Sequence, residues 1–378
     1  MSTTISIKTL TRSDVRPART WGTLAAAILM SVAGPTAWGA TSSSLNVLGQ
    51  VDSPRSYDLS ALQNRSPASQ VTQTDVFASG AGTQTHTYTG PSLWNVLNNT
   101  SYGAGGITVS GAKNDVLNKV VLVTATDGYK VVYSAGELSP NFGNEQALLA
   151  WGETTAGTLA PLGGDGFART TAPLDAKGGR YVSNVTSIQV LNTGSTVPYT
   201  GAAAVSTAFT VSGDVKTPGT IWDLAALKGL ASVTQTVGGH TYTGISLWSF
   251  LNAASVGLAT NSAVKNDLLD MYVVAVGADG YKAAFSMGEL SPDFGNSLTP
   301  DDSHPLLDLI AYQMDGEDLT SSGFARVVAP NDLKQGRWVS NLVGLEIYHA
   351  APVPEPEACI LVLAGVMLVR PMRRNARR

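Results

Sequence analysis

The sequence predicts an α+β fold, mostly β, in which one domain occurs twice in tandem between two sorting segments. Three observations lead to this prediction. The chain is poor in charge, at 14% of 378 residues, and rich in glycine, with 39, which is typical of turn-rich β proteins. Five motifs recur in the same order in its two halves. Both ends combine an apolar run with basic residues, and the part between them does not.

Residues 1–39 are expected to be a secretory signal peptide. The basic residues Lys8, Arg12, Arg16 and Arg19 precede an apolar run, 21–32, and small residues around Gly39 would form the cleavage site. No two of the basic residues are adjacent, so the paired-arginine signal for exporting folded, cofactor-loaded proteins is absent. We therefore expect the export machinery as a partner and an unfolded chain at export.

The body of the chain contains one domain twice. The repeated motifs are 86–94 and 240–248, 127–130 and 279–282, 136–144 and 288–296, 166–169 and 323–326, and 180–184 and 337–341. Offsets of 152 to 157 residues make the repeating unit a whole domain rather than a solenoid repeat. We expect repeat domain 1 at 41–193, a Gly/Ser/Thr/Ala-rich linker at 194–208 and repeat domain 2 at 209–349.

Within the second copy, β-branched and alternating residues predict strands at 208–215, 233–237, 240–243, 271–276, 281–285, 309–314, 325–328 and 343–348. Gly238-Gly239 predicts a hairpin turn between two of these strands. Asp223 and Ser246 can each cap a short helix that buries leucines. These elements give a mostly-β domain with a few short helices.

The C-terminus has three features in a fixed order. Val353, Pro354, Glu355 and Pro356 come first, an apolar run of 12 residues (358–369) follows, and five arginines end the chain. This order resembles the PEP-CTERM sorting signal of Gram-negative bacteria. The resemblance implies processing by an exosortase and a transient C-terminal membrane anchor. It also implies delivery to the periplasm, the outer surface or the exopolysaccharide matrix. The run is shorter than the roughly 17–25 residues that span a bilayer, and a plain membrane anchor is the alternative.

Between the two ends, charge and cysteine content exclude several classes of protein. Residues 40–352 hold 15 Lys and Arg against 25 Asp and Glu, a net charge of −10. Such a body disfavours nucleic acid and other anionic partners. The single cysteine, Cys359, lies in the C-terminal apolar run, so no intrachain disulfide can form.

The repeated residues resemble the molybdopterin-binding domain of the sulfite oxidase family. The second copy carries the likeness from Phe209 to Tyr348, with a Leu-Trp helix, strands around Asp-Gly-Tyr, then Arg-Val-Val-Ala-Pro and Gly-Arg-Trp-Val. In that family a cysteine thiolate after the strand equivalent to 233–237 ligates molybdenum. Here that region contains no cysteine, and neither Thr236 nor His240 is an equivalent soft ligand. The resemblance therefore implies the fold without the redox reaction.

Four arginines are candidate ligand-binding residues. Arg326 and Arg337, with Arg169 and Arg180 in the first copy, are similar in position to the family's basic residues around the pterin phosphate. A planar guanidinium suits a phosphate or carboxylate. The alternative is that these arginines pair with neighbouring acids such as Asp332 or Asp175.

The other repeated candidates are His86, His240, Glu137 and Glu289. Each histidine follows an expected hairpin turn. It is either a ligand-binding or proton-transfer residue, or a turn residue whose ring bonds to the backbone. Each glutamate lies in a strictly repeated Gly-Glu-Leu-Ser-Pro loop, which favours either a shared ligand site or a helix-capping loop. No motif predicts a catalytic residue or a metal ligand.

The leading hypothesis is an exported, surface- or matrix-associated protein that acts as a non-catalytic binding or structural module without a cofactor. Two alternatives remain open. One is a molybdopterin-dependent oxidoreductase with atypical metal ligation. The other is an exopolysaccharide-binding protein in which Trp222, Tyr242 and Trp338 offer aromatic platforms.

Overall fold

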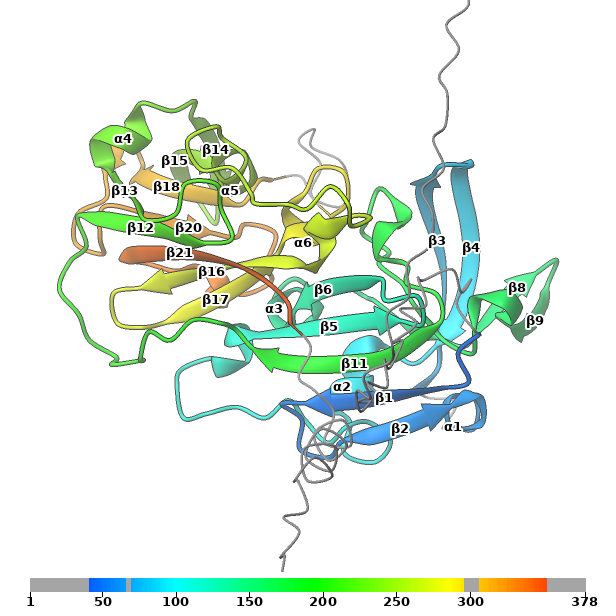
Figure 1. The fold of residues 1–378 in the computed structure, drawn as a ribbon. Helices are drawn as coiled ribbons and strands as arrows, with labels where there is room; N and C mark the ends of the chain where they lie inside the picture. The colour runs from blue at the N-terminus through cyan, green and yellow to red at the C-terminus, as the bar shows by residue number, and fades with distance from the viewer. Residues whose placement is uncertain (1–40, 66–68, 296–305, 352–378) are drawn as a thin grey trace, which may run out of the picture. The chain divides into compact units, whose positions relative to one another are not determined.

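The computed structural model describes residues 41–65, 69–295 and 306–351 (Figure 1). The expected signal peptide, the sorting segment 353–378 and Cys359 lie outside the described residues. Strands dominate, and the longest α-helix has six residues, which confirms the prediction of a mostly-β fold with short helices. No helix among the described residues is long and apolar enough to span a membrane.

Two five-stranded sheets share one strand order. The first runs β2-β1-β11-β5-β6 and the second β13-β12-β21-β16-β17. Their strands are β1 (Ser44–Gly49), β2 (Arg55–Asp58), β5 (Lys119–Ala125), β6 (Lys130–Ser134), β11 (Val185–Asn192), β12 (Ala208–Gly213), β13 (Thr220–Asp223), β16 (Met271–Gly277), β17 (Lys282–Ser286) and β21 (Leu342–His349). In both sheets the first long strand pairs in parallel with the last strand of its half, β1 with β11 and β12 with β21.

A second, antiparallel sheet belongs to each half. In the first half its order is β3-β4-β8-β9; in the second it is β14-β15-β18-β19, with β20 also paired to β18. The strands are β3 (Val71–Ser79), β4 (Gly82–Gly90), β8 (Gly152–Thr155), β9 (Thr158–Pro161), β14 (Val233–Val237), β15 (His240–Ser246), β18 (Leu309–Met314), β19 (Glu317–Asp318) and β20 (Arg326–Val328). The short strands β7 (Leu149–Ala150) and β10 (Arg169–Thr170) pair separately.

The helices begin at the side chains that the sequence suggests as caps. Asp223 accepts a hydrogen bond from the Ala226 amide at 2.8 Å, and Ser246 accepts one from the Ser249 amide at 3.3 Å, as expected for N-cap residues. The helices are α1 (Leu59–Gln63), α2 (Leu93–Asn98), α3 (Ala135–Leu138), α4 (Leu224–Lys228), α5 (Leu247–Leu251) and α6 (Met287–Leu290).

All predicted strands of the second half are present, with ends that differ by up to three residues. Two short strands were not predicted, β13 and β19. β13 has four residues between a Pro-Gly turn and a helix cap, and β19 has only two. β16 is buried along its whole length, which fits its continuous apolar sequence.

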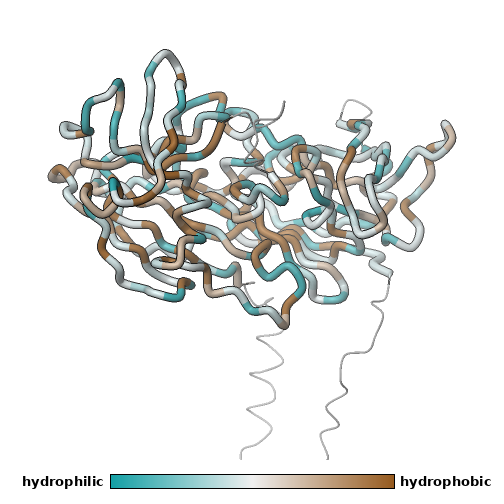
Figure 2. The backbone as a smooth tube through the Cα atoms, turned by 90° about the horizontal axis from the view of Figure 1, so that it is seen from above, coloured by the Kyte–Doolittle hydropathy of each residue, from teal (hydrophilic) through white to brown (hydrophobic). Residues whose placement is uncertain are grey.

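Each half has its own apolar core, and each core also includes side chains from the other half. Leu117 and Phe142 from the first half belong to the core of the second half. Leu269 belongs to the core of the first half, and Phe294 packs against that core. A third cluster joins β5 and β6 to β16 and β17. Figure 2 shows hydrophobic residues along the interior strands and hydrophilic ones in many outer loops. The described residues of both halves belong to one compact unit.

Candidate functional site

Four of the eight predicted site residues, Glu137, Glu289, Arg180 and Arg337, meet where the two halves touch. Both arginine side chains are buried, with 0% of Arg180 and 5% of Arg337 exposed. Arg180 ends the 3₁₀ helix η4 (Gly178–Arg180), and Arg337 ends η6 (Gln335–Arg337). The glutamates lie in α3 and α6.

Each guanidinium is held by two carboxylates of its own half. Arg180 donates from Nε and Nη2 to Asp175 at 2.8 and 2.5 Å, and its Nη1 donates to Glu137. Arg337 repeats this arrangement with Asp332 at 2.8 and 2.5 Å and with Glu289 at 2.5 Å. Bidentate pairs of this kind are the strong form of the arginine–carboxylate contact. Pairing with the neighbouring acids, the alternative open from sequence, is what the structure shows.

The glutamates have two structural tasks. Glu137 and Glu289 complete capping boxes with Ser134 and Ser286, which begin α3 and α6. The same serines also donate across the halves, Ser134 to Glu289 and Ser286 to Glu137, both at 2.8 Å. The repeated loop is therefore both a helix cap and a contact between halves.

Glycines in the repeated loops admit the arginines. A methyl group added at Gly136 would lie 2.5 Å from Cδ of Arg337, and one at Gly288 would lie 2.6 Å from Cδ of Arg180. Real Cβ atoms do not approach so closely. The repeated glycine of Gly-Glu-Leu-Ser-Pro thus leaves room for the arginine side chain of the other half.

Acidic groups outnumber basic ones at this contact, which we call the arginine–carboxylate network. Besides the four paired acids it includes Glu145 and Asp308. Burial raises the pKa of Asp308 to about 8 and that of Glu289 to about 7, although Arg337 opposes both shifts. Burial also raises the pKa of Glu145 and of Asp175. A pKa of about 8 favours the protonated form of Asp308 at neutral pH.

These residues do not fit a molybdopterin. The cavity beside the network measures about 60 Å³, which is room for only a few water molecules. Both guanidinium groups already face carboxylates, so neither has a free edge for a phosphate. The acidic surroundings would repel an anionic group. The residues 40–352 also lack a cysteine.

The other four predicted residues lie apart from the network. His86 Nδ1 is 2.7 Å from Glu153, and His240 Nδ1 is 2.7 Å from Asp315. The partners are carboxylates rather than the backbone, and they stand 67 and 75 residues away in the chain. Sequence spacing therefore could not reveal them.

Arg169 and Arg326 each lie over an aromatic ring. Arg169 pairs with Asp165 at 2.7 Å and lies 5.0 Å from the ring centre of Tyr88. Arg326 lies 5.6 Å from the Trp338 ring, and burial lowers its pKa. The eight predicted residues thus do not line one cleft.

The aromatic residues suggested as glycan platforms are unsuitable. Trp222, Tyr242 and Trp338 are 8%, 3% and 9% exposed. Trp222 and Tyr242 pack against the rings of Phe250 and Trp338. The structure corrects this expectation, because all three side chains serve the core of the second half.

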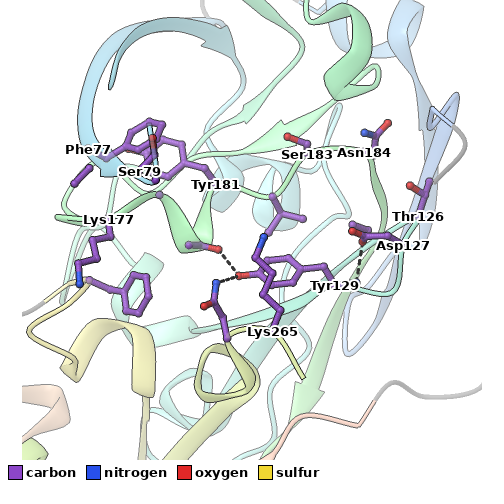
Figure 3. A pocket seen from close by; sticks show the side chains of 18 residues that line it. Phe77, Ser79, Thr126, Asp127, Tyr129, Lys177, Tyr181, Ser183, Asn184 and Lys265 are labelled. Atoms are coloured by element: carbon purple, nitrogen blue, oxygen red, sulfur yellow. Dashed lines mark hydrogen bonds between the residues drawn. The ribbon is translucent and has the colours of Figure 1, made fainter. Parts of the chain in front are cut away.

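An open groove lies instead beside the first half (Figure 3). Its volume is about 680 Å³, and it is lined by Phe77–Gly80, Ala125–Asp127, Tyr129, Lys177–Gly179, Tyr181–Asn184, Lys265, Asn266 and Phe294. One wall is the end of the β3–β4 hairpin. That hairpin pairs nine residues on each strand, whereas β14 and β15 pair five. The wall is therefore a feature of the first half alone.

Tyr129 lies at the centre of the groove. Its hydroxyl donates to the Gly179 carbonyl at 2.8 Å and accepts from Asn266 Nδ2 at 2.9 Å. Lys265 Nζ lies 5.8 Å from its ring centre. Tyr129 and Phe294 are half-buried, and Phe77 stacks on Tyr181 behind them with ring centres 4.0 Å apart.

In the second half, the chain itself covers the equivalent turn. Thr200, which lies between β11 and β12, donates its amide to the Asp279 carbonyl at 2.7 Å. A methyl group at Gly280 would lie 1.9 Å from the Pro198 carbonyl oxygen, whereas one at Gly128 in the first half would meet no atom within 4 Å. Among the described residues, the Asp-Gly-Tyr turn of the first half is thus left open to a ligand.

Repeated residues did not indicate the groove, because its hairpin wall occurs in only one of the two halves. The available signal was a difference between the copies: the β3–β4 hairpin, which contains His86, is longer than the β14–β15 hairpin, which contains His240.

Comparison with known proteins gives little. No family model and no curated protein matches the chain. Among solved structures, the chain is similar to the crystal structure of the sulfane dehydrogenase SoxCD from Paracoccus pantotrophus, with 11% sequence identity and a TM-score of 0.31. The likeness covers 64% of this chain and 58% of that one, less than two thirds of either. A likeness at this TM-score carries no conclusion about fold or activity.

Proposed function

We propose that the protein is an exported, non-catalytic binding module of the cell surface or exopolysaccharide matrix, and that its groove holds a glycan. The two ends of the chain support export and exosortase processing, since they match a signal peptide and a PEP-CTERM segment in residue order. Matrix delivery would place the groove among polysaccharides.

The observation that carries the proposal is the groove around Tyr129. Ligand sites are concave, largely preformed and lined by aromatic rings with a few polar groups. Here Tyr129 and Phe294 offer partly exposed rings. The hydroxyl of Ser183, which donates to Asp165 at 3.0 Å, can still accept a hydrogen bond. Sugar rings present apolar faces and hydroxyl edges to such a surface.

Charge favours a neutral glycan. Lys177 pairs with Asp293 at 2.5 Å, and Asp127 balances Lys265 in the lining. The net charge of −10 over residues 40–352 opposes a polyanion at long range.

We further infer that each half is a degenerate form of the molybdopterin-binding domain. The order of the repeated sequence elements supports this. Of the four arginines similar in position to the family's pterin-phosphate residues, Arg180 and Arg337 are instead occupied by carboxylates at the contact between the halves. The oxidoreductase alternative needs free cations and a soft metal ligand, and no observation favours it.

The test compares two equivalent tyrosines. Tyr281 makes the same contacts as Tyr129, donating to the Gly336 carbonyl at 2.5 Å and accepting from Asn114 at 2.9 Å. Tyr129→Ala and Tyr281→Ala should therefore cost similar stability, but only Tyr129 lines the groove. We expect Tyr129→Ala to weaken binding to the organism's own polysaccharide by about 2- to 12-fold, from about 0.5–1.5 kcal/mol of aromatic contact.

Binding is measured by retention on immobilised polysaccharide and by calorimetry with neutral oligosaccharides. Unchanged affinity in Tyr281→Ala completes the expected result. No retention of the unaltered protein, or equal loss in both variants, would refute the groove as a glycan site.

A further inference from the structure

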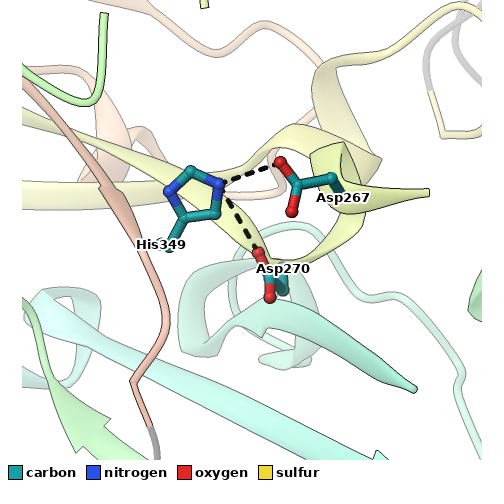
Figure 4. A group of neighbouring side chains, drawn as sticks. All are labelled: Asp267, Asp270 and His349. Carbon is teal, nitrogen blue, oxygen red and sulfur yellow. Dashed lines mark hydrogen bonds and ion pairs between the residues drawn. The ribbon is translucent and has the colours of Figure 1, made fainter. Parts of the chain in front are cut away.

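Beside the groove, three side chains converge on one point (Figure 4). Asp267 and Asp270 lie on the 3₁₀ helix η5 (Asp267–Asp270), and His349 ends β21. Nε2 of His349 is 3.2 Å from Asp267 Oδ2 and 3.9 Å from Asp270 Oδ1. The three ligand atoms all lie within 4.8 Å of one another.

A fourth residue orients the imidazole. Asp214 Oδ2 lies 2.8 Å from Nδ1 of His349 and accepts the His349 amide at 2.8 Å. With a metal ion bound, a proton on Nδ1 would leave the lone pair of Nε2 for the ion. Metal-binding histidines are commonly fixed by a carboxylate in this way.

At the equivalent position of the first half, a lysine side chain supplies a positive charge. Asp115 takes the place of Asp267, and Lys119 Nζ binds its Oδ2 at 2.6 Å with both side chains buried. The same oxygen accepts the Ser110 amide, as Asp267 Oδ2 accepts the Asn261 amide. An internal ammonium therefore occupies a buried cation position in the first half.

In the second half the ammonium is gone and further ligands are present. Register places Met271 opposite His349 where Lys119 lies opposite Asn192. Lysine is thus replaced by methionine, and asparagine by histidine. At the end of η5 stands Asp270, where the corresponding 3₁₀ helix η2 (Asp115–Asn118) ends in asparagine. After β12 stands Asp214, where Gln50 follows β1.

These exchanges change the charge of the location. One carboxylate and one ammonium in the first half become three carboxylates and one imidazole in the second. Asp270 Oδ1 is a buried atom without a hydrogen-bond partner among the described residues. Lys130 lies farther off and acts on Asp270 only at long range.

We propose that Asp267, Asp270 and His349 bind a divalent transition-metal ion of the Zn²⁺ class, with Asp214 as the positioning residue. One imidazole nitrogen and two carboxylate oxygens, with water as a fourth ligand, form a zinc donor set. Bonds of about 2.1 Å place tetrahedral ligands about 3.4 Å apart, close to the 3.2 and 3.9 Å observed.

The ion has an entry path. A cavity of about 560 Å³ is lined by Lys130, Asp267 and Asp270 and by four residues that also line the groove: Asp127, Tyr129, Lys265 and Asn266. His349 is 31% exposed. The metal site is independent of the glycan proposal, because its readout is metal binding alone.

The test is a Zn²⁺ titration of the full chain, stripped with a chelator and carrying no histidine tag. We expect one Zn²⁺ per chain and, with Co²⁺ as probe, the visible absorption of a tetrahedral site. Three variants restore first-half residues, which the fold already accepts: Asp270→Asn, His349→Asn and Met271→Lys. Each of these variants should weaken Zn²⁺ affinity by about 10-fold or more. Asp214→Asn should weaken Zn²⁺ affinity by about 10- to 100-fold.

Two controls address histidines elsewhere. His240→Ala removes an exposed histidine paired with a single carboxylate, and His304→Ala removes the histidine of Asp-Asp-Ser-His. Both should keep wild-type affinity. Absence of stoichiometric Zn²⁺ binding, wild-type affinity in folded Asp270→Asn, or loss of the site in His304→Ala would each overturn the proposal. Thermal unfolding without metal verifies that each variant is folded.

Discussion

Replacement of Arg180 by methionine should strongly destabilise the protein. Methionine keeps most of the apolar stem but removes the guanidinium, so Asp175 and Glu137 lose their common partner. The exposed fractions of these three side chains are 0%, 0% and 4%. No solvent can replace the lost charge, and solvent screening does not reduce the effect.

The expected loss is about 3–5 kcal/mol of unfolding free energy, the range for removing one partner of a buried ion pair. Arg180 makes a bidentate contact with Asp175, a contact with Glu137 and a longer one of 3.4 Å with Ser286 of the other half. The loss should be smaller in mild acid, because burial raises the pKa of Asp175 and protonation then removes the uncompensated charge.

Urea unfolding followed by circular dichroism measures the loss. Arg326→Met is the matched control, since Arg326 forms no ion pair within the described residues and mainly contacts the Trp338 ring. The control should lose at most about 2 kcal/mol. A loss below about 1 kcal/mol in Arg180→Met, or one no larger than in the control, would refute the structural role of the arginine–carboxylate network.

Two further predictions concern the same network. Because burial raises the pKa of Glu289 to about 7 and that of Asp308 to about 8, the folded state binds more protons than the unfolded state between about pH 4.5 and 8. Unfolding free energy should therefore fall by at least about 1 kcal/mol as pH rises through this window and level off above it; a rise in urea-measured stability would contradict the assignment. Gly288→Ala should cost about 1–3 kcal/mol, since its methyl group would lie 2.6 Å from Arg180 Cδ. Gly111→Ala, where no atom lies within 4 Å of the added methyl group, should be neutral; urea unfolding measures both variants.

Local chemistry made much of the fold predictable. Hydrophobic alternation and β-branched runs marked the strands of the second half, and Asp223 and Ser246 began helices as their side-chain oxygens favour. The capping role of Glu137 and Glu289 was one of two alternatives visible from sequence, because serine three residues before glutamate is a helix-start pattern.

The contact between halves was not predictable from one sequence. Repetition marked Glu137 and Arg180 as important, but it could not show that their partners include Ser286 and Gly288 of the other copy. Such contacts depend on how the two sheets meet, which no local pattern encodes. Repeated motifs here indicate fold requirements rather than a ligand site.

The groove and the metal cluster were not predicted either, because neither is marked by a repeated motif. The groove depends on a hairpin extension that occurs once, and the metal cluster joins residues 82 positions apart, Asp267 and His349. Comparison of equivalent positions would have pointed to the metal cluster, since Met271 and His349 pair where the first half pairs Lys119 and Asn192.

Arg180 and Arg337 bind carboxylates where the two halves touch, and we infer that they bind no pterin phosphate. The most direct measurement is the molybdenum and pterin content of protein purified from its native source, by mass spectrometry of the metal and by fluorescence after acid denaturation. We predict no stoichiometric amount of either. One molybdenum or one pterin per domain, lost in Arg180→Met and in Arg337→Met, would contradict the claim.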